Sequence, residues 1–270
     1  MKLQVPNFTN SMLNRVARGD LSVFKEEHDF TLTEYLDDLD WNALSVAATK
    51  GYLNLVNCLL GITEVRANAA AVNNAALRGA AINGHLEVVN RLLEIEAVMA
   101  SAVARNNNAL RRAAENGHLE VVNRLLEIEA VRANAAAEHN FALIMAAENG
   151  HLDVVNRLLE INEVSANAAA VNNYALRWAA ANGHLEVVNR LLEIEAVIEN
   201  VAAGYNDALI IDALRIAASE GHLDVVNRLL EIESVRANAT AINNYVLRWA
   251  AGNGHSEVVH ALAKAQWPLG

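Results

Sequence analysis

Histidines are the residues of this sequence best suited to bind a metal ion, but their spacing argues against a metal site. The chain has nine, and six of them follow a glycine in successive copies of one phrase: His85, His118, His151, His184, His222 and His255. Residues that recur once per copy along an array do not converge on one ion. The other three, His28, His139 and His260, have no second ligand at a spacing such as i, i+4. We therefore predict no metal site, and we expect no cofactor.

Carboxylates recur in the same regular way, which does not suit acid–base catalysis. Glu87 stands four residues before Arg91, and four later copies keep this spacing: Glu120 and Arg124, Asp153 and Arg157, Glu186 and Arg190, Asp224 and Arg228. On a helix, this order predicts exposed ion pairs worth about 0.3–0.5 kcal/mol each. A catalytic pair needs two environments that separate the two pKa values, and equivalent copies provide none. The sequence also has no glycine-rich phosphate loop and no nucleophile beside a base, so we predict that the protein is not an enzyme.

These side chains belong to a tandem repeat. Glycines recur in steps of 32 or 33 residues, with one step of 38: Gly19, Gly51, Gly84, Gly117, Gly150, Gly183, Gly221 and Gly254. From Gly84 onward the phrase Asn-Gly-His-Leu-Glu-Val-Val-Asn-Arg-Leu-Leu-Glu-Ile is nearly literal, with Asp replacing Glu at 153 and 224. A self-similar period of this length predicts a stacked array, here of eight units.

Each unit is expected to contain two short helices joined by an Asn-Gly turn. In one unit, Leu77, Ala80 and Ala81 share one face of a first helix over 75–82, and the Val-Val and Leu-Leu pairs of 86–95 share one face of a second helix. The alanine pair recurs in later copies and has so little volume that neighbouring helices can approach closely. Neither helix buries its apolar face alone, so the units must stack.

The 33-residue period, a leucine before an Ala-Ala pair, and Gly-His-Leu-Glu-Val-Val with Leu-Leu resemble the ankyrin repeat over essentially the whole chain. The resemblance implies an all-α solenoid of about eight stacked helix-turn-helix units, terminal caps included. It also implies that each repeated histidine bonds to the backbone of a neighbouring repeat. Two motifs differ from the family, since Asn-Ala-Leu-Arg111 replaces Thr-Pro-Leu-His and Glu-Ala-Val replaces Gly-Ala-Asp. The connection over 129–137 has no Gly or Pro and is rich in helix formers, so we expect the usual β-hairpin finger to be remodelled or partly helical.

The predicted organisation is one ankyrin-like domain over residues 1–270. Residues 1–40 form an N-terminal cap unit with an acidic connection, residues 41–243 hold six repeats, and residues 244–270 form a C-terminal cap repeat. In the last unit, Val-Val-Asn-Arg-Leu-Leu-Glu-Ile becomes Val-Val-His-Ala-Leu-Ala-Lys-Ala, and this loss of bulk predicts the end of the array. A five-residue insertion near 198–211 lengthens one step.

Composition limits the partners and the location. The net charge is −11, so a nucleic-acid backbone is repelled on average. The single cysteine, Cys58, excludes an internal disulfide, and no stretch reaches the ~18 consecutive apolar residues that a membrane span needs. The copies with Asn-Asn-Tyr-Ala-Leu-Arg-Trp are also similar to ankyrin proteins of intracellular bacteria, which are often delivered into host cells. We expect a monomer in the cytoplasm, or in a host cytoplasm after secretion outside the Sec pathway.

The positions at which the copies disagree indicate where a partner binds. The second helices are nearly invariant, whereas the first helices, which the resemblance places with the connections on the concave face, vary around the repeat leucine. The candidate contact residues on the first helices are Arg78, Arg111, Arg112, Phe141, Met145, Tyr174, Arg177, Trp178, Arg215, Tyr245, Arg248 and Trp249. Arginine with tyrosine and tryptophan is typical of interface hot spots, and the arginines favour a partner protein with an acidic surface. The insertion adds Tyr205 and Asp207, because loops often carry recognition.

Each assignment has an alternative. The aromatic residues can fill gaps between helices, the arginines can neutralise neighbouring glutamates, and the insertion can be neutral. Two other classes of function are a self-assembling scaffold and an enzyme whose chemistry lies in the insertion or the N-terminal acidic stretch. An engineered array is a further alternative, although irregularities such as Asn162 and Ser165 favour natural duplication. We predict a non-catalytic module that binds a partner protein, such as a bacterial effector acting on a host protein.

Overall fold

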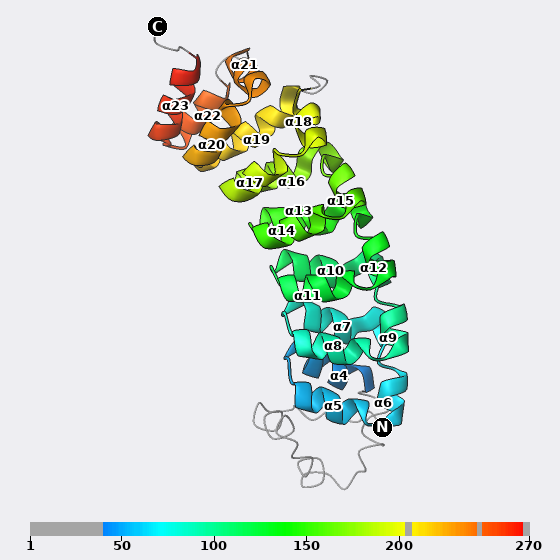
Figure 1. Ribbon diagram of the computed structural model, residues 1–270. Helices are drawn as coiled ribbons and strands as arrows, with labels where there is room; N and C mark the ends of the chain where they lie inside the picture. The colour runs from blue at the N-terminus through cyan, green and yellow to red at the C-terminus, as the bar shows by residue number, and fades with distance from the viewer. Residues whose placement is uncertain (1–39, 203–206, 242–244, 267–270) are drawn as a thin grey trace.

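The computed structural model describes residues 40–202, 207–241 and 245–266, which form one row of stacked helical units (Figure 1). The first helices of the units are α4 (Asp40–Thr49), α7 (Ala71–Ile82), α10 (Ala104–Glu115), α13 (Ala137–Glu148), α16 (Ala170–Ala181), α19 (Asp207–Glu220) and α22 (Tyr245–Gly252). The second helices are α5 (Leu53–Leu60), α8 (Leu86–Leu93), α11 (Leu119–Leu126), α14 (Leu152–Leu159), α17 (Leu185–Leu191), α20 (Leu223–Leu230) and α23 (Ser256–Gln266). The third helices are α6 (Thr63–Ala67), α9 (Glu96–Ala100), α12 (Glu129–Ala133), α15 (Asn162–Ala166), α18 (Glu195–Ala202) and α21 (Glu233–Ala241). The predicted all-α solenoid is confirmed, and the N-terminal cap unit predicted before residue 40 lies outside the described residues.

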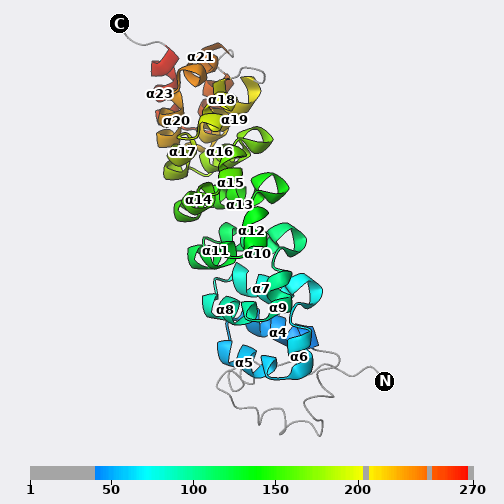
Figure 2. The same cartoon turned by 45° about the vertical axis from the view of Figure 1, so that its right-hand side comes forward.

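Apolar stripes on the first and second helices make one continuous core. Val88, Val89 and Leu92 on α8 are buried, as are Leu77 and Ala80 on α7, and none of these side chains is more than 1% exposed. Full burial of a valine or leucine side chain contributes about 1.5–3 kcal/mol, so the stripes that recur in each unit drive the stacking. The small alanines allow first helices of adjacent units, such as α7 and α10, to pack side by side (Figure 2).

The glycine of each Asn-Gly turn is required by its backbone and by its neighbour. Gly117 has a φ of +71°, in the left-handed region that favours glycine. A Cβ atom at this position would lie 2.5 Å from Nδ1 of His151 in the next unit. The turn therefore brings two successive units into contact where neither has room for another side chain.

Four of the first helices contain a left-handed turn near their N-terminus, which was not predicted. In α10, Arg105, Asn106 and Asn107 have φ values of 53°, 55° and 59°, and right-handed helix follows them. The same conformation occurs over residues 72–74, 138–140 and 171–173. A left-handed L-residue costs about 1–2 kcal/mol, and asparagine tolerates this region better than most residues. The conformation therefore accounts for the Asn-Asn pair that three of these four turns contain, and for the final asparagine that all four share.

The last asparagine of each left-handed turn fastens the first helix to the third helix. Asn107 is 1% exposed, and its Nδ2 donates to the carbonyl oxygens of Val131 at 2.7 Å and Asn134 at 2.8 Å. The equivalent asparagines of the other three turns each donate to the equivalent valine carbonyl, at 2.7 to 3.1 Å: Asn74, Asn140 and Asn173. A buried Nδ2 group left without an acceptor costs about 1–3 kcal/mol, so this bond offsets part of the cost of the left-handed turn.

The third helices occupy the place of the usual β-hairpin fingers. In the described ranges every connection of this kind is helical and no strand is found, which confirms that the fingers are remodelled. Figure 1 shows the third helices along one edge of the stack and the Asn-Gly turns along the other. The upper part of the stack bends towards the turn edge, so the third helices lie on the outer side of this bend.

Candidate functional site

One side of the first helices faces away from the second helices and carries the variable positions. On α10, Leu110 and Ala113 are buried, whereas Arg111 is partly buried and Arg112 is exposed. We call this surface the first-helix face. It contains twelve of the predicted contact residues: Arg78, Arg111, Arg112, Phe141, Met145, Tyr174, Arg177, Trp178, Arg215, Tyr245, Arg248 and Trp249. Tyr205 lies outside the described residues, and Asp207 is described only as the first residue of α19.

Three arginines at the N-terminal end of this face are engaged within their own units. Arg78 Nη1 donates to the carbonyl oxygen of Val72 at 2.8 Å, and to that of Asn73. Arg111 Nη2 donates to the carbonyl oxygen of Arg105 at 3.0 Å, while Arg112 pairs with a glutamate of its own helix, Glu115, at 2.7 Å. Arg78 and Arg111 therefore hold carbonyl groups of the left-handed turns. Burial, with a smaller contribution from Arg105, lowers the pKa of Arg78 from its ordinary value.

A carboxylate that the sequence analysis did not select joins the arginines of the C-terminal half. Asp212 on α19 accepts from Arg215 Nη2 at 3.0 Å through Oδ1 and from Arg177 Nη2 of α16 at 3.2 Å through Oδ2. The three side chains are 21–26% exposed, so solvent screens them only in part. Asp212 thus couples two neighbouring units on the first-helix face. The signal that could have found it is an aspartate three residues before an arginine, at a position occupied by tyrosine in other copies.

Two tyrosine–tryptophan pairs flank this carboxylate. Tyr174 and Trp178 pack edge to face with ring centroids 5.8 Å apart, and Tyr245 and Trp249 do so at 6.1 Å. The guanidinium carbon of Arg177 lies 5.8 Å from the Tyr174 ring centroid, and that of Arg215 lies 6.0 Å from the Trp249 ring centroid. We call the seven residues of this continuous set the aromatic–arginine network: Tyr174, Arg177, Trp178, Asp212, Arg215, Tyr245 and Trp249.

Exposure separates the aromatic residues that fill gaps from those that face solvent. Met145 and Tyr174 pack partly buried against the core, as the gap-filling alternative expects. By contrast, Trp178 is 37% exposed, Tyr245 39% and Trp249 43%. Large exposed apolar rings held by neighbouring contacts are preorganised for an interface.

Two other candidates differ from the network. Phe141 lies under Arg111, with the guanidinium carbon 5.1 Å from the ring centroid. Arg248 is exposed and makes no ion pair or side-chain hydrogen bond with any residue that the structure describes. Arg248 therefore has no fixed counterion among the residues that the structure describes.

The repeated histidines serve the contact between units. Nε2 of His151 donates to the carbonyl oxygen of Glu115 in the preceding unit at 3.1 Å, and five others make the equivalent bond: His85, His118, His184, His222 and His255. The structural role implied by the resemblance is confirmed. Within the described ranges, no group of three or more His, Cys, Asp or Glu side chains is placed to hold a metal ion.

The repeated arginines of the second helices also join neighbouring units, and the predicted i, i+4 ion pairs are wrong. Arg124 Nε donates to Oδ1 of Asn90 in the preceding unit at 2.8 Å, and its Nη1 pairs at 3.0 Å with Glu127, three residues later. Among the described residues no ion pair joins Glu120 to Arg124, nor any of the other four predicted pairs. The asparagine acceptor draws the guanidinium across to the preceding unit and towards the end of its own helix.

This contact recurs five times, and we call it the arginine ladder. Its donor and acceptor pairs are Arg91 with Asn57, Arg124 with Asn90, Arg157 with Asn123, Arg190 with Asn156, and Arg228 with Asn189. Each of these arginines also pairs with the glutamate three residues after it. The ladder explains why asparagine, arginine and glutamate recur at the same positions of the second helices.

Comparison with known proteins gives a family match and a similar fold. The family model for ankyrin repeats, in three copies, matches residues 44–138, 110–203 and 176–267. Among solved structures, the ankyrin repeat domain of human ASB11 is 22% identical with a TM-score of 0.61, and covers 84% of this chain and 99% of that chain. An ankyrin repeat family protein from Legionella pneumophila is 26% identical with a TM-score of 0.47, and covers 97% of this chain and 83% of that chain. The search of curated proteins finds no match. Over the described ranges, no helix is both long and apolar enough to cross a membrane.

Proposed function

Since the chain belongs to the ankyrin-repeat family, we propose that it is a non-catalytic protein-binding module whose first-helix face holds the partner. The aromatic–arginine network carries this proposal. It extends over three successive first helices, α16, α19 and α22, and it keeps two tryptophan rings exposed. Clusters of tryptophan, tyrosine and arginine supply most of the binding energy in protein interfaces, and a standard interface buries about 1,200–2,000 Å².

The proposed partner has an acidic surface opposite this face. Six arginines lie on it, whereas the carboxylates that pair with them are Glu115 and Asp212. The guanidinium of Arg248 makes no ion pair with any described residue, so it meets a partner carboxylate without first breaking such a pair. The first-helix face therefore attracts acidic groups even though the whole chain is negative.

Partner capture tests the site directly. The double substitution Trp178→Ala and Trp249→Ala removes the two exposed rings, and we expect capture of the partner from lysate to fall at least tenfold. The matched control is Met99→Ala, which removes an apolar side chain of equal exposure, 43%, from the third helix α9. Capture that survives the double substitution at the level of the control contradicts the proposed site.

A charge substitution tests whether the partner presents an acidic surface to the first-helix face. Arg248→Glu reverses a side chain that makes no ion pair among the described residues, so folding stays intact while capture of an acidic partner weakens. Reversal of Arg177 is a poorer test, because it leaves the carboxylate of Asp212 with one guanidinium fewer. Equal capture by wild type and Arg248→Glu excludes an acidic surface opposite this residue.

The finer parts of the proposal are a monomeric state and action as an effector in a host cytoplasm. Light scattering at two protein concentrations distinguishes a monomer from a self-assembling scaffold, because a scaffold gains mass with concentration. Fractionation of infected cells tests the location. These parts rest on the sequence pattern and stay predictions.

A further inference from the structure

The arginine ladder stops one step before the end of the described chain. In α20, Arg228 reaches back to Asn189 and pairs with Glu231 on its own helix. In α23, the next second helix, Ala261 stands at the arginine position and Lys264 at the glutamate position. The last step therefore lacks the ladder arginine. Three residues later, a lysine replaces the glutamate, so the charge at that position is reversed.

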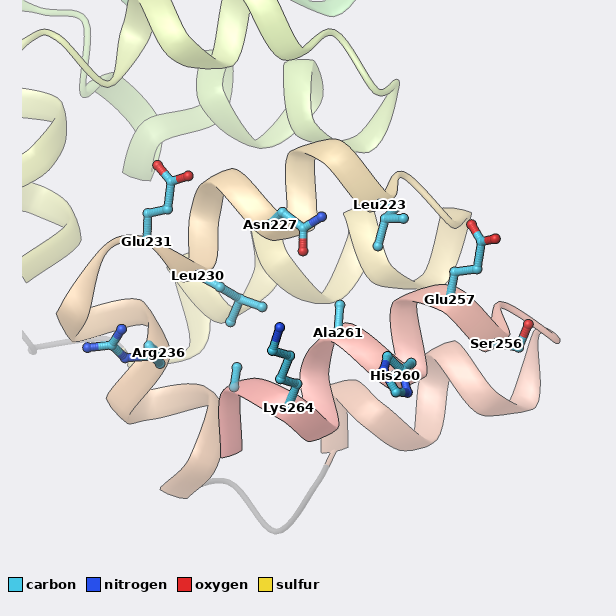
Figure 3. Close-up of a pocket in the computed structure, with 11 residues that line it drawn as sticks. Leu223, Asn227, Leu230, Glu231, Arg236, Ser256, Glu257, His260, Ala261 and Lys264 are labelled. Carbon is cyan, nitrogen blue, oxygen red and sulfur yellow. The ribbon is translucent and has the colours of Figure 1, made fainter. Parts of the chain in front are cut away.

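A groove of about 840 Å³ opens where this arginine is missing. It lies between α20, α21 and α23 (Figure 3). Leu223, Leu230, Ala261 and Ala265 supply its apolar lining. In Figure 3 the ammonium group of Lys264 points into the groove between Leu230 and Ala261.

The polar groups around the groove differ in whether they are already engaged. Glu231 is paired with Arg228 at 3.0 Å, and Arg236 lies 3.9 Å from Glu233. Asn227 is the acceptor that the missing arginine would have used. Within the described residues, Asn227 makes no side-chain hydrogen bond and Lys264 makes no ion pair.

The charges around the incomplete ladder step favour a negatively charged ligand. A guanidinium placed on Asn227 would meet the ammonium of Lys264 where the other five steps offer a carboxylate, so a basic guest is repelled. A carboxylate is attracted to Lys264 and can accept from Asn227 Nδ2. Glu257, the other acidic residue of the lining, lies at the opposite end of the groove from Arg236 in Figure 3.

We propose that this groove binds an acidic, leucine-bearing segment of a partner protein, with one carboxylate paired to Lys264 and apolar side chains against Leu230 and Ala261. The bound segment then takes the place of the missing ladder arginine. The ion pair has its charges exchanged, because the partner supplies the carboxylate and this chain supplies the cation. This second docking surface lies on the side of the second helices and is separate from the first-helix face.

A pair of labelled peptides tests the charge preference. The probe is a fluorescein-labelled helical peptide with leucines at i, i+3, i+4 and i+7 and glutamates at flanking positions, and its control carries lysine at each glutamate position. In fluorescence anisotropy at low salt, we expect the glutamate peptide to bind at least tenfold more tightly to the full chain. Equal binding of both peptides, or binding of neither, overturns the proposal.

Completion of the ladder tests the place of binding. The double substitution Ala261→Arg and Lys264→Glu rebuilds the sixth step and fills the groove. We expect a higher melting temperature together with at least a tenfold loss of affinity for the glutamate peptide, so the loss cannot come from unfolding. The milder Lys264→Gln is expected to reduce affinity without filling the groove, and Trp178→Ala with Trp249→Ala is expected to leave it unchanged. Unchanged affinity in the ladder-completing variant, or loss in the tryptophan variant, overturns the assignment to this groove.

Discussion

The first-helix face and the back formed by the second helices use arginine in opposite ways. On the back, arginines such as Arg124 occur at one position and make one pair of contacts, to an asparagine of the preceding unit and a glutamate of their own. On the first-helix face, arginines at one position make different contacts: Arg111 holds a backbone carbonyl, Arg215 pairs with Asp212, and Arg248 is unpaired among the described residues. The arginine contacts are thus the same in each unit where the units stack. They differ from unit to unit on the first-helix face, which is the surface proposed to bind the partner.

The largest expected effect comes from the turn that both regions share. Gly117→Ala places a Cβ atom 2.5 Å from the His151 ring and an L-residue at a φ of +71°. We expect the free energy of unfolding to fall by about 3–4 kcal/mol, from left-handed strain and overpacking together. Chemical denaturation measures it. The control is Gly252→Ala, where no atom lies within 4 Å of the added Cβ and φ is not positive, so stability should be unchanged or slightly higher.

The buried tether between first and third helices is expected to matter next. Asn107→Ala removes two hydrogen bonds, leaves the carbonyls of Val131 and Asn134 without this donor, and places alanine in a left-handed conformation. We expect a loss of about 2–3 kcal/mol in the free energy of unfolding. The exposed Asn106, whose side chain contacts Glu138, is the control and should lose less when changed to Ala. Equal losses at the two positions contradict the tether.

An arginine from each region tests the comparison itself. Arg124→Met keeps the aliphatic stem but removes the bonds to Asn90 and Glu127, and we expect the free energy of unfolding to fall by about 1 kcal/mol. Arg248→Met should leave stability unchanged, because this arginine has no such bonds among the described residues. Thermal denaturation of the two variants side by side measures the difference. A larger loss of stability in Arg248→Met than in Arg124→Met contradicts the proposal that the second-helix arginines stabilise the stack and Arg248 does not.

The smallest effect is a gain. Val171 is 48% exposed and has a φ of 51°, so Val171→Gly relieves about 1–2 kcal/mol of left-handed strain. Glycine loses about 0.5–1 kcal/mol more backbone entropy on folding, which leaves a net gain of about 0.5–1 kcal/mol in the free energy of unfolding. Val46→Gly, at 44% exposure in the right-handed helix α4, should instead lose about 0.5 kcal/mol. A loss at both positions shows that the left-handed turn carries no strain.

The stacking could be predicted from the sequence because it depends on the spacing of the apolar residues. Leucine and alanine at helical intervals, with a period of 33 residues, are enough to predict helices, their order and the buried stripe. The helical connections were predictable from their lack of Gly and Pro. The left-handed turns were not, because their cost is repaid by a distant bond, such as that from Asn107 to Val131, that local preference does not show.

For the candidate site, the sequence indicated which positions share a face but not which contacts their side chains make. The variable positions of the first helices do share one face, yet which arginines are engaged depends on neighbouring units. Asp212 is opposite Arg177 only because α16 and α19 stack, and the two residues are 35 positions apart. The same reason explains the wrong ion pairs of the second helices, since Asn90 competes for Arg124 from 34 residues away.

The arginine ladder also makes the units interchangeable as building parts. Removal of residues 118–150 joins Gly117 to His151 and places Arg157 where Arg124 had been, beside the same Asn90. The glycine, histidine and asparagine at the new junction are the same residue types as at the other junctions between described units. Recombination between near-identical copies can therefore lengthen or shorten the array by whole units, which changes the length of the first-helix face while the contacts of the arginine ladder are preserved at the new junction.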